Sequence, residues 1–294
     1  MDPFQKVIYN VMIIKGKHLK VIPENNSFFK LSVSKTKTFQ TCKKKYLFNY
    51  IKKLPTQERD YHVFGKFLHL VLELFYKDII NKYVGPDNVL MKKSFNAALL
   101  SAMDKDPKQF KDKLTPEQKK ECFEILKLYL IKRQNDRQKN IVPTVIAVEK
   151  PFNIDIDGKV LLNGFIDLVK IDSDGVLHVA DYKTSKSSKY LKKDFTQLKT
   201  YAYVMCLEDP NLELVRCSYV MLRLNFEEVT KEYKRKEIML MENEIESNSE
   251  LIQSEKLFRA SPGPLCNYCD YLHLCSEAKE KLKIIDPNFG EINW

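Results

Sequence analysis

Two acidic residues and a lysine stand close together in the middle of the chain, in segments rich in Val, Ile and Leu. Asp167 lies within one such segment, and Asp181 and Lys183 follow fourteen and sixteen residues later on the next. Because side chains alternate along a strand, Asp181 and Lys183 project from the same face. Carboxylates can hold Mg²⁺ or Mn²⁺, which prefer oxygen ligands, and a lysine can offset charge that develops on a phosphate. An isolated Asp-x-Lys, however, is most often an ordinary pair of exposed strand charges.

The turn between the two acids decides whether they can form one site. An antiparallel pairing in which Asp167 faces Asp181 leaves a three-residue loop, Ser173-Asp174-Gly175, with glycine at the position that such loops usually hold at positive φ. A two-residue turn at Ser173-Asp174 would send the acids to opposite faces of the sheet. We therefore predict the three-residue loop with Gly175 at positive φ, or else a bulge before Asp181. The two carboxylates should then lie close enough to share one cation.

Five further residues could join this site. Gln197 and Tyr201 are four apart in one expected helix, and Gly65 and His69 are four apart in another, so each pair shares a helical face. Glu149 precedes the acidic hairpin on its own strand. These features make the ordinary-charge interpretation of Asp167, Asp181 and Lys183 less attractive.

The far end of the chain carries a second candidate site, made of cysteines. Cys266, Cys269 and Cys275 form a Cys-x₂-Cys-x₅-Cys pattern that is typical of metal binding and lacks a fourth ligand. Cys42 is the candidate for that ligand, and His273 is an alternative. Four thiolates fit zinc as well as an iron–sulfur cluster. The remaining cysteines lie in apolar patterns and are expected in the core: Cys122, Cys206 and Cys217.

Composition narrows the class of protein that carries these sites. Of 294 residues, 44% are apolar and 30% charged, which excludes a disordered or collagen-like chain. The formal net charge of +10 favours a polyanionic partner such as nucleic acid, although a solvated lysine-rich surface would explain it equally well. The apolar runs are too short to span a bilayer, and the first residues lack the pattern of a signal peptide, so we expect an intracellular protein without a membrane segment.

Periodicity and turn residues predict the elements that must position the candidate sites. Residues 7–33 alternate loosely and indicate one or two short strands. Helices are expected over 35–52 (with Ser34 as N-cap), 65–83, 88–104, 116–138, 191–207 and 235–259. Strands are expected over 144–156, 159–171, 176–182, 213–223 and 225–233. This order indicates one α/β domain with a central mixed sheet.

Together these motifs resemble the PD-(D/E)XK nuclease superfamily, specifically its RecB-like branch, which includes the nuclease domains of RecB and AddB, CRISPR-associated exonucleases and related phage exonucleases. The resemblance spans about residues 32–276. Four motifs carry it: glycine-x-x-x-histidine at Gly65 and His69, glycine-x-x-aspartate at Gly164 and Asp167, acid-x-lysine at Asp181 and Lys183, and glutamine-x-x-x-tyrosine at Gln197 and Tyr201. No proline precedes Asp167, where the superfamily name expects one, and residues 1–31 match no pattern that we can name.

The resemblance implies a restriction-endonuclease-like α/β core, a central mixed β-sheet flanked by helices, within a single nuclease domain over 1–294. Its parts would be N-terminal strands (1–31), a helical part (32–140), the catalytic sheet core (141–233), and a C-terminal helix with a cluster-binding cysteine tail (234–294).

The resemblance also implies a role for each motif residue. Asp167, Asp181 and Lys183 would be catalytic. The ligands of Mg²⁺ or Mn²⁺ would be His69, Asp167, Asp181 and the backbone carbonyl of Tyr182. Gln197 and Tyr201 would contact the DNA strand. A [4Fe–4S] cluster, with structural zinc as the alternative, would be held by Cys42, Cys266, Cys269 and Cys275.

The implied function is a metal-dependent DNA exonuclease that hydrolyses phosphodiester bonds in single-stranded DNA or at DNA ends, in replication, recombination or repair. Lysines within 35–53 and 183–193 could form its strand-binding surface. The alternative is a catalytically silent DNA-binding subunit of a helicase or recombination complex. A zinc-stabilised protein-interaction module would leave the motifs around His69 and Gln197 unexplained. Expected partners are DNA and a helicase or recombination protein, in the cytoplasm of a bacterium or a phage-infected host cell.

Overall fold

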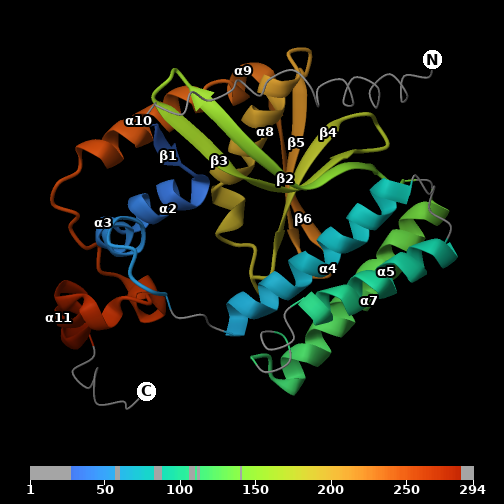
Figure 1. Ribbon diagram of the computed structural model, residues 1–294, viewed down its shortest axis with the longest axis horizontal. Helices are drawn as coiled ribbons and strands as arrows, with labels where there is room; N and C mark the ends of the chain where they lie inside the picture. The colour runs from blue at the N-terminus through green and yellow to red at the C-terminus, as the bar shows by residue number, and fades with distance from the viewer. Residues whose placement is uncertain are drawn as a thin grey trace. The chain divides into compact units, whose positions relative to one another are not determined.

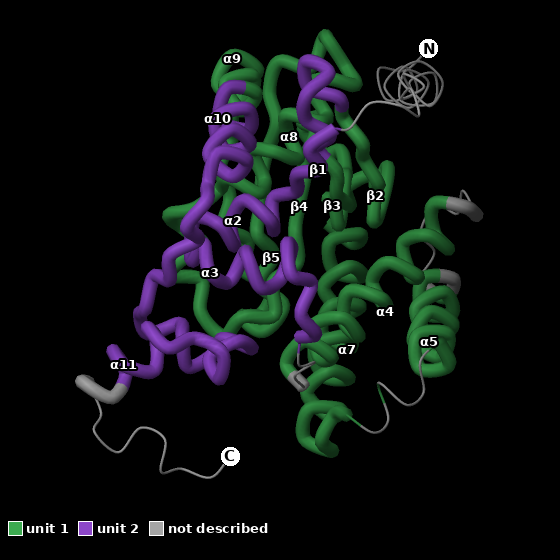
Figure 2. Tube along the Cα trace, turned by 60° about the vertical axis from the view of Figure 1, so that its left-hand side comes forward, with its two compact units in different colours: residues 1–27, 59–154, 163–242 green, residues 28–58, 155–162, 243–294 purple. Residues whose placement is uncertain are grey.

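The computed structural model describes residues 28–56, 60–82, 88–105, 110, 113–139 and 141–285 (Figure 1). The part of the chain before residue 28, where one or two short strands are expected, lies outside these residues, and so does residue 83, the last residue of the helix expected over 65–83. The described chain divides into two compact units, coloured separately in Figure 2: unit 1 holds residues 60–154 and 163–242, and unit 2 holds residues 28–56, 155–162 and 243–285.

The strands form a mixed sheet, as expected for an α/β chain. Its order is β1-β3-β4-β5-β6, with β2 also paired to β3. The strands are β1 (Phe29–Leu31), β2 (Thr144–Ile156), β3 (Val160–Ile171), β4 (Leu177–Lys183), β5 (Leu214–Met221) and β6 (Glu227–Lys234). β3 pairs antiparallel with β4, while β4 and β5 run parallel and are joined through helix α8 (Thr196–Glu208). The five predicted strands are confirmed within one or two residues.

The hairpin between β3 and β4 has the predicted register. Leu168 faces Ala180 and Ile171 faces Leu177, which is the register that aligns residue 167 with residue 181. The loop is Ser173-Asp174-Gly175, closed by a hydrogen bond from the Asp172 N–H to the Val176 carbonyl, and Gly175 has φ +82°. The regular pairing ends at Leu168 and Ala180, one residue before the two acids.

Unit 1 buries its largest core between the sheet and three helices that lie side by side (Figure 1). These helices are α4 (Asp60–Lys82), α5 (Asn88–Lys105) and α7 (Pro116–Gln138). α7 begins where the sequence predicts, because Thr115 and Gln118 form a capping box. α4 presents an apolar stripe that includes Phe64, Leu68, Val71 and Phe75, each at most 1% exposed.

Unit 2 is built from segments near both ends of the described chain. It contains β1, α2 (Val33–Thr41), α3 (Lys43–Tyr46), the π-helical turn η1 (Leu47–Ile51), most of α10 (Met241–Ser254), the 3₁₀ turns η3 (Pro264–Tyr268) and η4 (Leu272–Leu274), and α11 (Ser276–Ile285). Its core is aromatic: the Tyr46 ring stacks on Phe258, and the Phe48 ring meets Tyr271 edge-on.

Four helix predictions need correction. The helix expected over 65–83 is α4, which already includes Asp60. The helix expected over 35–52 begins instead after Ser32, whose side chain accepts from the Lys35 N–H, and it breaks at Cys42. Cys42 has an extended backbone, ends α2 with its N–H and caps α3 with its sulfur. The helix expected over 191–207 starts only at Thr196, after the 3₁₀ turn η2 (Leu191–Lys193). The helix expected over 235–259 is divided into α9 (Arg235–Ile238) and α10.

The cysteine tail also contains a helix, α11, that the sequence interpretation left out. Among the described residues, no helix has both the length and the apolar character needed to cross a membrane.

Candidate functional site

The end of the β3–β4 pairing frees the backbone of Tyr182 for site residues. Its N–H donates to Oδ2 of Asp167 at 3.0 Å, and its carbonyl oxygen lies 3.1 Å from Nε2 of His69. Because the two strands separate after Ala180, these backbone groups bond to side chains instead of to β3. His69, on α4, reaches the same carboxylate with its other ring nitrogen, Nδ1, at 3.3 Å from Asp167 Oδ2.

Three potential ligand atoms, from His69, Glu149 and Asp167, lie within 4.8 Å of one another. Burial and the negative charge of Asp181 raise the pKa of Asp167 well above its usual range. Burial and the nearby Glu73 raise the pKa of Glu149, and burial lowers the pKa of His69. Clustered carboxylates that resist ionisation together are stabilised by a cation, so the cluster has the chemistry of a divalent metal site.

Asp181 and Lys183 form the second half of the site. Their carboxylate and ammonium groups lie 2.6 Å apart. Gln197, from α8, donates from Nε2 to Asp181 Oδ1 at 2.6 Å and accepts from Lys183 Nζ at 3.1 Å. The same Nε2 donates to the Tyr201 hydroxyl at 2.8 Å. The structure thus brings all four predicted residues together, with Gln197 as the bridge.

Asp167 and Asp181 were expected to share one cation, but only Asp167 belongs to the cluster of three potential ligands. Asp181 lies outside the group formed by His69, Glu149 and Asp167. Its Oδ2 atom is nevertheless buried, and its one partner is the Lys183 ammonium at 2.6 Å, which leaves one of its two lone pairs unused. A buried carboxylate oxygen with an unused lone pair, next to a cluster of ligand atoms, fits a divalent cation.

Glu149 is the ligand candidate that the motifs did not assign. It lies in the middle of β2 with a positive φ of +44°, a conformation that costs a non-glycine residue free energy. Its position before the acidic hairpin was visible in the sequence, but its distance to His69 and Asp167 depends on this local bend. Neither glycine nor asparagine stands at residue 149, but Pro151, two residues later in the same strand, is a sequence signal for an irregularity that could have pointed to this bend.

Both motif glycines lie where another chain segment approaches closely. A Cβ on Gly65 would lie 3.3 Å from Oγ1 of Thr184, the residue after Lys183. A Cβ on Gly164 would lie 2.7 Å from Cζ of Phe152. Gly65 therefore lets α4 approach the end of β4, and Gly164 leaves room for an aromatic ring.

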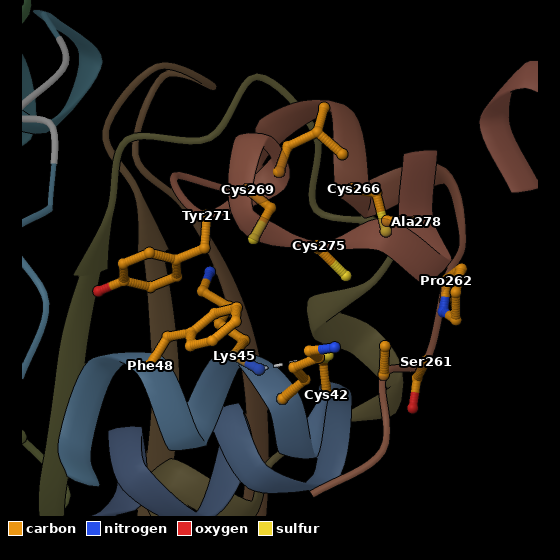
Figure 3. Close-up of a pocket in the computed structure, with 13 residues that line it drawn as sticks. Cys42, Lys45, Phe48, Ser261, Pro262, Cys266, Cys269, Tyr271, Cys275 and Ala278 are labelled. Carbon is orange, nitrogen blue, oxygen red and sulfur yellow. Dashed lines mark hydrogen bonds between the residues drawn. The ribbon is translucent and has the colours of Figure 1, made fainter. Parts of the chain in front are cut away.

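The four candidate cysteines line one hollow in unit 2 (Figure 3). Cys42 comes from the junction of α2 and α3, and Cys266, Cys269 and Cys275 come from the tail. The hollow has an empty volume of about 320 Å³ and is open to solvent on one side. Burial raises the pKa values of Cys269 and Cys275. His273 is exposed and does not line the hollow, so the structure gives it no place as a ligand.

The spacing of these thiols bears on which metal they fit. Among the described residues, no three of the cysteine sulfurs lie within 4.8 Å of one another. A single tetrahedral zinc ion, with Zn–S bonds of about 2.3 Å, would hold its thiolates about 3.8 Å apart. The described cysteine sulfurs therefore do not already form a compact three-ligand zinc site.

The other three cysteines are core residues, as predicted. Cys122, Cys206 and Cys217 are all 0% exposed. Burial raises the pKa of Cys122 to about 12, so this thiol stays protonated at neutral pH.

The predicted lysine surface is partly occupied by internal contacts. Lys43 pairs with Glu255 at 2.5 Å, and Lys44 pairs with Glu277 at 2.6 Å. Both pairs lie within unit 2 and join its early segment to its late one. These two lysines therefore contribute less positive field to the surface than their number suggests.

Comparisons with known proteins find relatives whose names combine a helicase with a deoxyribonuclease. Three curated proteins, each named as one subunit of an ATP-dependent helicase/deoxyribonuclease, come from Streptococcus agalactiae serotypes Ia, V and III and are 30% identical over 189 residues. The match covers 61% of this chain and 16% of each relative, so the chain spans a small part of their length. The crystal structure of SSO0001 covers 93% of this chain and 97% of its own, at 14% identity and a TM-score of 0.38.

A family comparison covers most of the chain. Residues 30–276 match the family described as the PD-(D/E)XK nuclease superfamily. The matched range includes every residue of the acidic site and all four cysteines of the hollow. The chain therefore belongs to the PD-(D/E)XK nuclease superfamily.

Proposed function

We propose that this chain is a Mg²⁺- or Mn²⁺-dependent deoxyribonuclease that acts as an exonuclease. The observation that carries the proposal is the convergence of His69, Asp167, Asp181 and Lys183 from α4, β3 and β4 around the freed backbone of Tyr182. Two carboxylates, one of them buried, a histidine whose pKa is lowered by burial, and a lysine have the ligand and charge requirements of metal-assisted phosphodiester hydrolysis.

In this proposal each residue has a role that its contacts support. His69, Asp167, Asp181 and the Tyr182 carbonyl would bind the cation, with Glu149 as a further ligand. A bound divalent cation would supply Lewis acidity at the phosphate and lower the pKa of a water molecule. Lys183, oriented by Asp181 and Gln197, would orient that water and offset negative charge on the phosphate.

The role of Gln197 and Tyr201 on the DNA strand remains a prediction. Tyr201 is 6% exposed, so its ring has little surface on which a base could stack. Gln197 is already bonded to Asp181, Lys183 and Tyr201. These contacts support an orienting role beside, or in place of, direct contact with DNA.

The substrate and partner follow from charge and from the relatives. A net charge of +10 favours a polyanion, and we propose single-stranded DNA or DNA ends as the substrate. The relatives' names pair a helicase with a deoxyribonuclease, which supports a helicase or recombination partner for this chain as well.

We propose that the cysteine hollow holds a [4Fe–4S] cluster with a structural role. The convergence of Cys42 with Cys266, Cys269 and Cys275 on one hollow supports a shared metal group, and the resemblance described above favours the cluster over zinc. When bound, the cluster would join residue 42 covalently to residues 266–275 through its irons. Backbone N–H groups of Lys45 and Gly263 already point at the sulfurs of Cys42 and Cys266, at 3.5 and 3.3 Å.

The proposed activity can be tested with a digestion series. The purified protein is incubated with end-labelled linear duplex, circular duplex and single-stranded DNA, in Mg²⁺, in Mn²⁺ and in chelator. We expect degradation of substrates with free ends in either metal, and none in chelator. Asp181→Asn and Lys183→Met should each lower the rate at least about 100-fold, because they remove a ligand or the charge that offsets the phosphate.

Matched controls are available at the end of α5, where Asp104 and Lys105 are exposed. Asp104→Asn and Lys105→Met make the same chemical changes away from the site and should leave the rate within about twofold. Near-normal degradation by Asp181→Asn would refute the assigned site. DNA binding without degradation by the wild type in both metals would favour the silent-subunit alternative.

A further inference from the structure

Three tyrosine hydroxyls form a buried chain on the face of β4 opposite Asp181 and Lys183. The hydroxyl oxygens of Tyr76 and Tyr129 lie 2.6 Å apart, and those of Tyr129 and Tyr182 lie 3.1 Å apart. The three side chains are between 3% and 5% exposed. They come from α4, α7 and β4, so the chain of hydroxyls crosses the core of unit 1.

The far end of this chain is held by a buried cation. Arg133 hydrogen-bonds to Tyr76 and lies 5.4 Å from the centre of the Tyr129 ring. Asp136 neutralises Arg133 at 2.5 Å. Every hydroxyl in the chain therefore has a partner, which offsets the free-energy cost of burying it.

Tyr182 is consequently tied to α4 at two points. Its backbone carbonyl lies 3.1 Å from His69, and its hydroxyl reaches Tyr76 through Tyr129. His69 and Tyr76 are seven residues apart, which is about two turns, so they share one face of α4. Two separated links between the same helix and the same strand residue oppose both sliding and rotation of α4 along β4.

We propose that Tyr129 is a positioning residue of the active site, whose hydroxyl fixes Tyr182 and, through the Tyr182 backbone, the placement of Asp167 and His69. The Tyr182 N–H donates to Asp167, and the Tyr182 carbonyl meets His69, so a shift of this residue changes both contacts. The metal readout below rests on the proposed function, whereas the amide-exchange readout does not.

Apolar side chains in place of Tyr76, Tyr129 and Tyr182 would fill the same volume, but they would not fix the orientation of α4 relative to β4. Phenylalanine has the shape of tyrosine and packs alike, but it lacks the directional bond that selects one arrangement of helix and strand. Replacing Tyr129 by Phe removes the central link and leaves the ring in place. Replacing Tyr76 by Phe removes only the outer link and keeps the bond between Tyr129 and Tyr182.

The test compares Tyr129→Phe with Tyr203→Phe in the full chain. Tyr203 is a matched control, because it is 2% exposed and its hydroxyl donates one bond, to Glu242 at 2.8 Å, away from the site. Hydrogen exchange of the Tyr182 amide is followed by NMR in the metal-free protein, and Mn²⁺ affinity is measured by calorimetry. Thermal unfolding of both variants shows whether their losses of stability are comparable.

For Tyr129→Phe we expect Tyr182 amide exchange to rise about tenfold or more and Mn²⁺ affinity to fall about tenfold or more, the size usual for groups that orient metal ligands. Tyr203→Phe should change both by less than about twofold. Equal effects of the two variants would overturn the inference. If Tyr129→Phe does not fold, Tyr76→Phe must show the same changes at smaller size, and unchanged exchange there would overturn it.

Failure of the proposed function would look different. A wild-type protein that binds no Mn²⁺ would remove the metal site, while the exchange of the Tyr182 amide would still decide the role of Tyr129.

Discussion

Gly164 lies at a position where no larger residue fits without moving an aromatic ring. The Phe152 ring occupies the space that a Cβ would need, and its centre lies 6.1 Å from the Tyr201 ring in an edge-on contact. Tyr201 in turn accepts a hydrogen bond from Gln197, which bridges Asp181 and Lys183. Gly164, which lies outside the paired part of the β3–β4 hairpin, is therefore connected to the candidate site through contacts of the Phe152 ring, the Tyr201 ring and the Gln197 amide.

Gly164→Ala should therefore reduce both stability and activity. We expect a loss of about 1–3 kcal/mol in the free energy of unfolding, because the added methyl forces Phe152 out of place. Phe152→Leu in the same chain should recover part of that loss by making room. Urea unfolding of the two single variants and the double variant measures the coupling between them.

The same substitution at the other motif glycine is a control. Gly65→Ala meets only the movable hydroxyl of Thr184 at 3.3 Å, and alanine favours the helix that contains it. Its unfolding free energy should stay within about 1 kcal/mol of the wild type.

Additive effects of Gly164→Ala and Phe152→Leu on the free energy of unfolding would contradict the contact between Gly164 and the Phe152 ring.

At the scale of elements, the Asp172 carboxylate stabilises the turn of the β3–β4 hairpin through hydrogen bonds. Asp172 accepts hydrogen bonds from His178 at 2.8 Å and from Arg216 at 2.6 Å. Burial raises the pKa of Asp172, but the bond from His178, the charge of Lys170 and the bond from Arg216 outweigh it, and the pKa lies well below its usual range. Burial also lowers the pKa of His178.

These shifts predict that the protein loses stability in acid. Below about pH 6.5 the unfolded chain protonates His178, and below about pH 4 it protonates Asp172, while the folded chain resists both. The unfolded state then binds more protons, so the free energy of unfolding falls as the pH falls. Asp172→Asn should flatten the fall between about pH 4.5 and 3 by about 1 kcal/mol or less, allowing for solvent screening of this half-buried group.

Urea unfolding of wild type and variant at several pH values between 7 and 3 measures this difference. Asp104→Asn, an exposed carboxylate on α5, should leave the acid slope as it is. An acid slope of Asp172→Asn that matches the wild type would show that the turn does not hold a low-pKa carboxylate.

The same hairpin shows what the sequence could predict and what it could not. Its register followed from parity along the strands and from the glycine at residue 175, both of which are local properties. The break at Cys42 did not follow, because it depends on a cysteine that ends one helix and caps the next, and cysteine carries no helix-stop signal. The geometry of the bend at Glu149 depends on neighbours that are distant in sequence, and so does the Tyr76–Tyr129–Tyr182 chain.

At the scale of the whole molecule, unit 2 is assembled from three stretches of chain, and the four cysteines of the hollow come from the first and the last. The ion pairs Lys43–Glu255 and Lys44–Glu277 join the same stretches, but each is worth at most about 1 kcal/mol at the surface. Linking residue 42 to residue 275 closes a loop of 233 residues, an entropy term of about 5 kcal/mol.

Cys42→Ser should therefore remove the cluster and much of the stability of unit 2. We expect the brown colour and the iron content of anaerobically purified protein to be lost, with a lower melting temperature. Cys206→Ser, in the core of unit 1, should cost stability but keep the iron. Iron and zinc per chain, measured by mass spectrometry, decide the metal. One zinc and no iron in the wild type would defeat the cluster and leave the four-cysteine site standing.

The number of residues between Cys42 and Cys275 also determines how long after Cys42 the ribosome makes Cys275. A ribosome that adds about 5–20 residues each second makes Cys275 roughly 10–50 s after Cys42. During that interval residues 29–31 can already pair with Val160–Leu162, but the cysteines of the tail are not yet made, while most of unit 1 is already translated. Because the ligands arrive in this order, the proposed cluster would be inserted only after most of unit 1 has been translated.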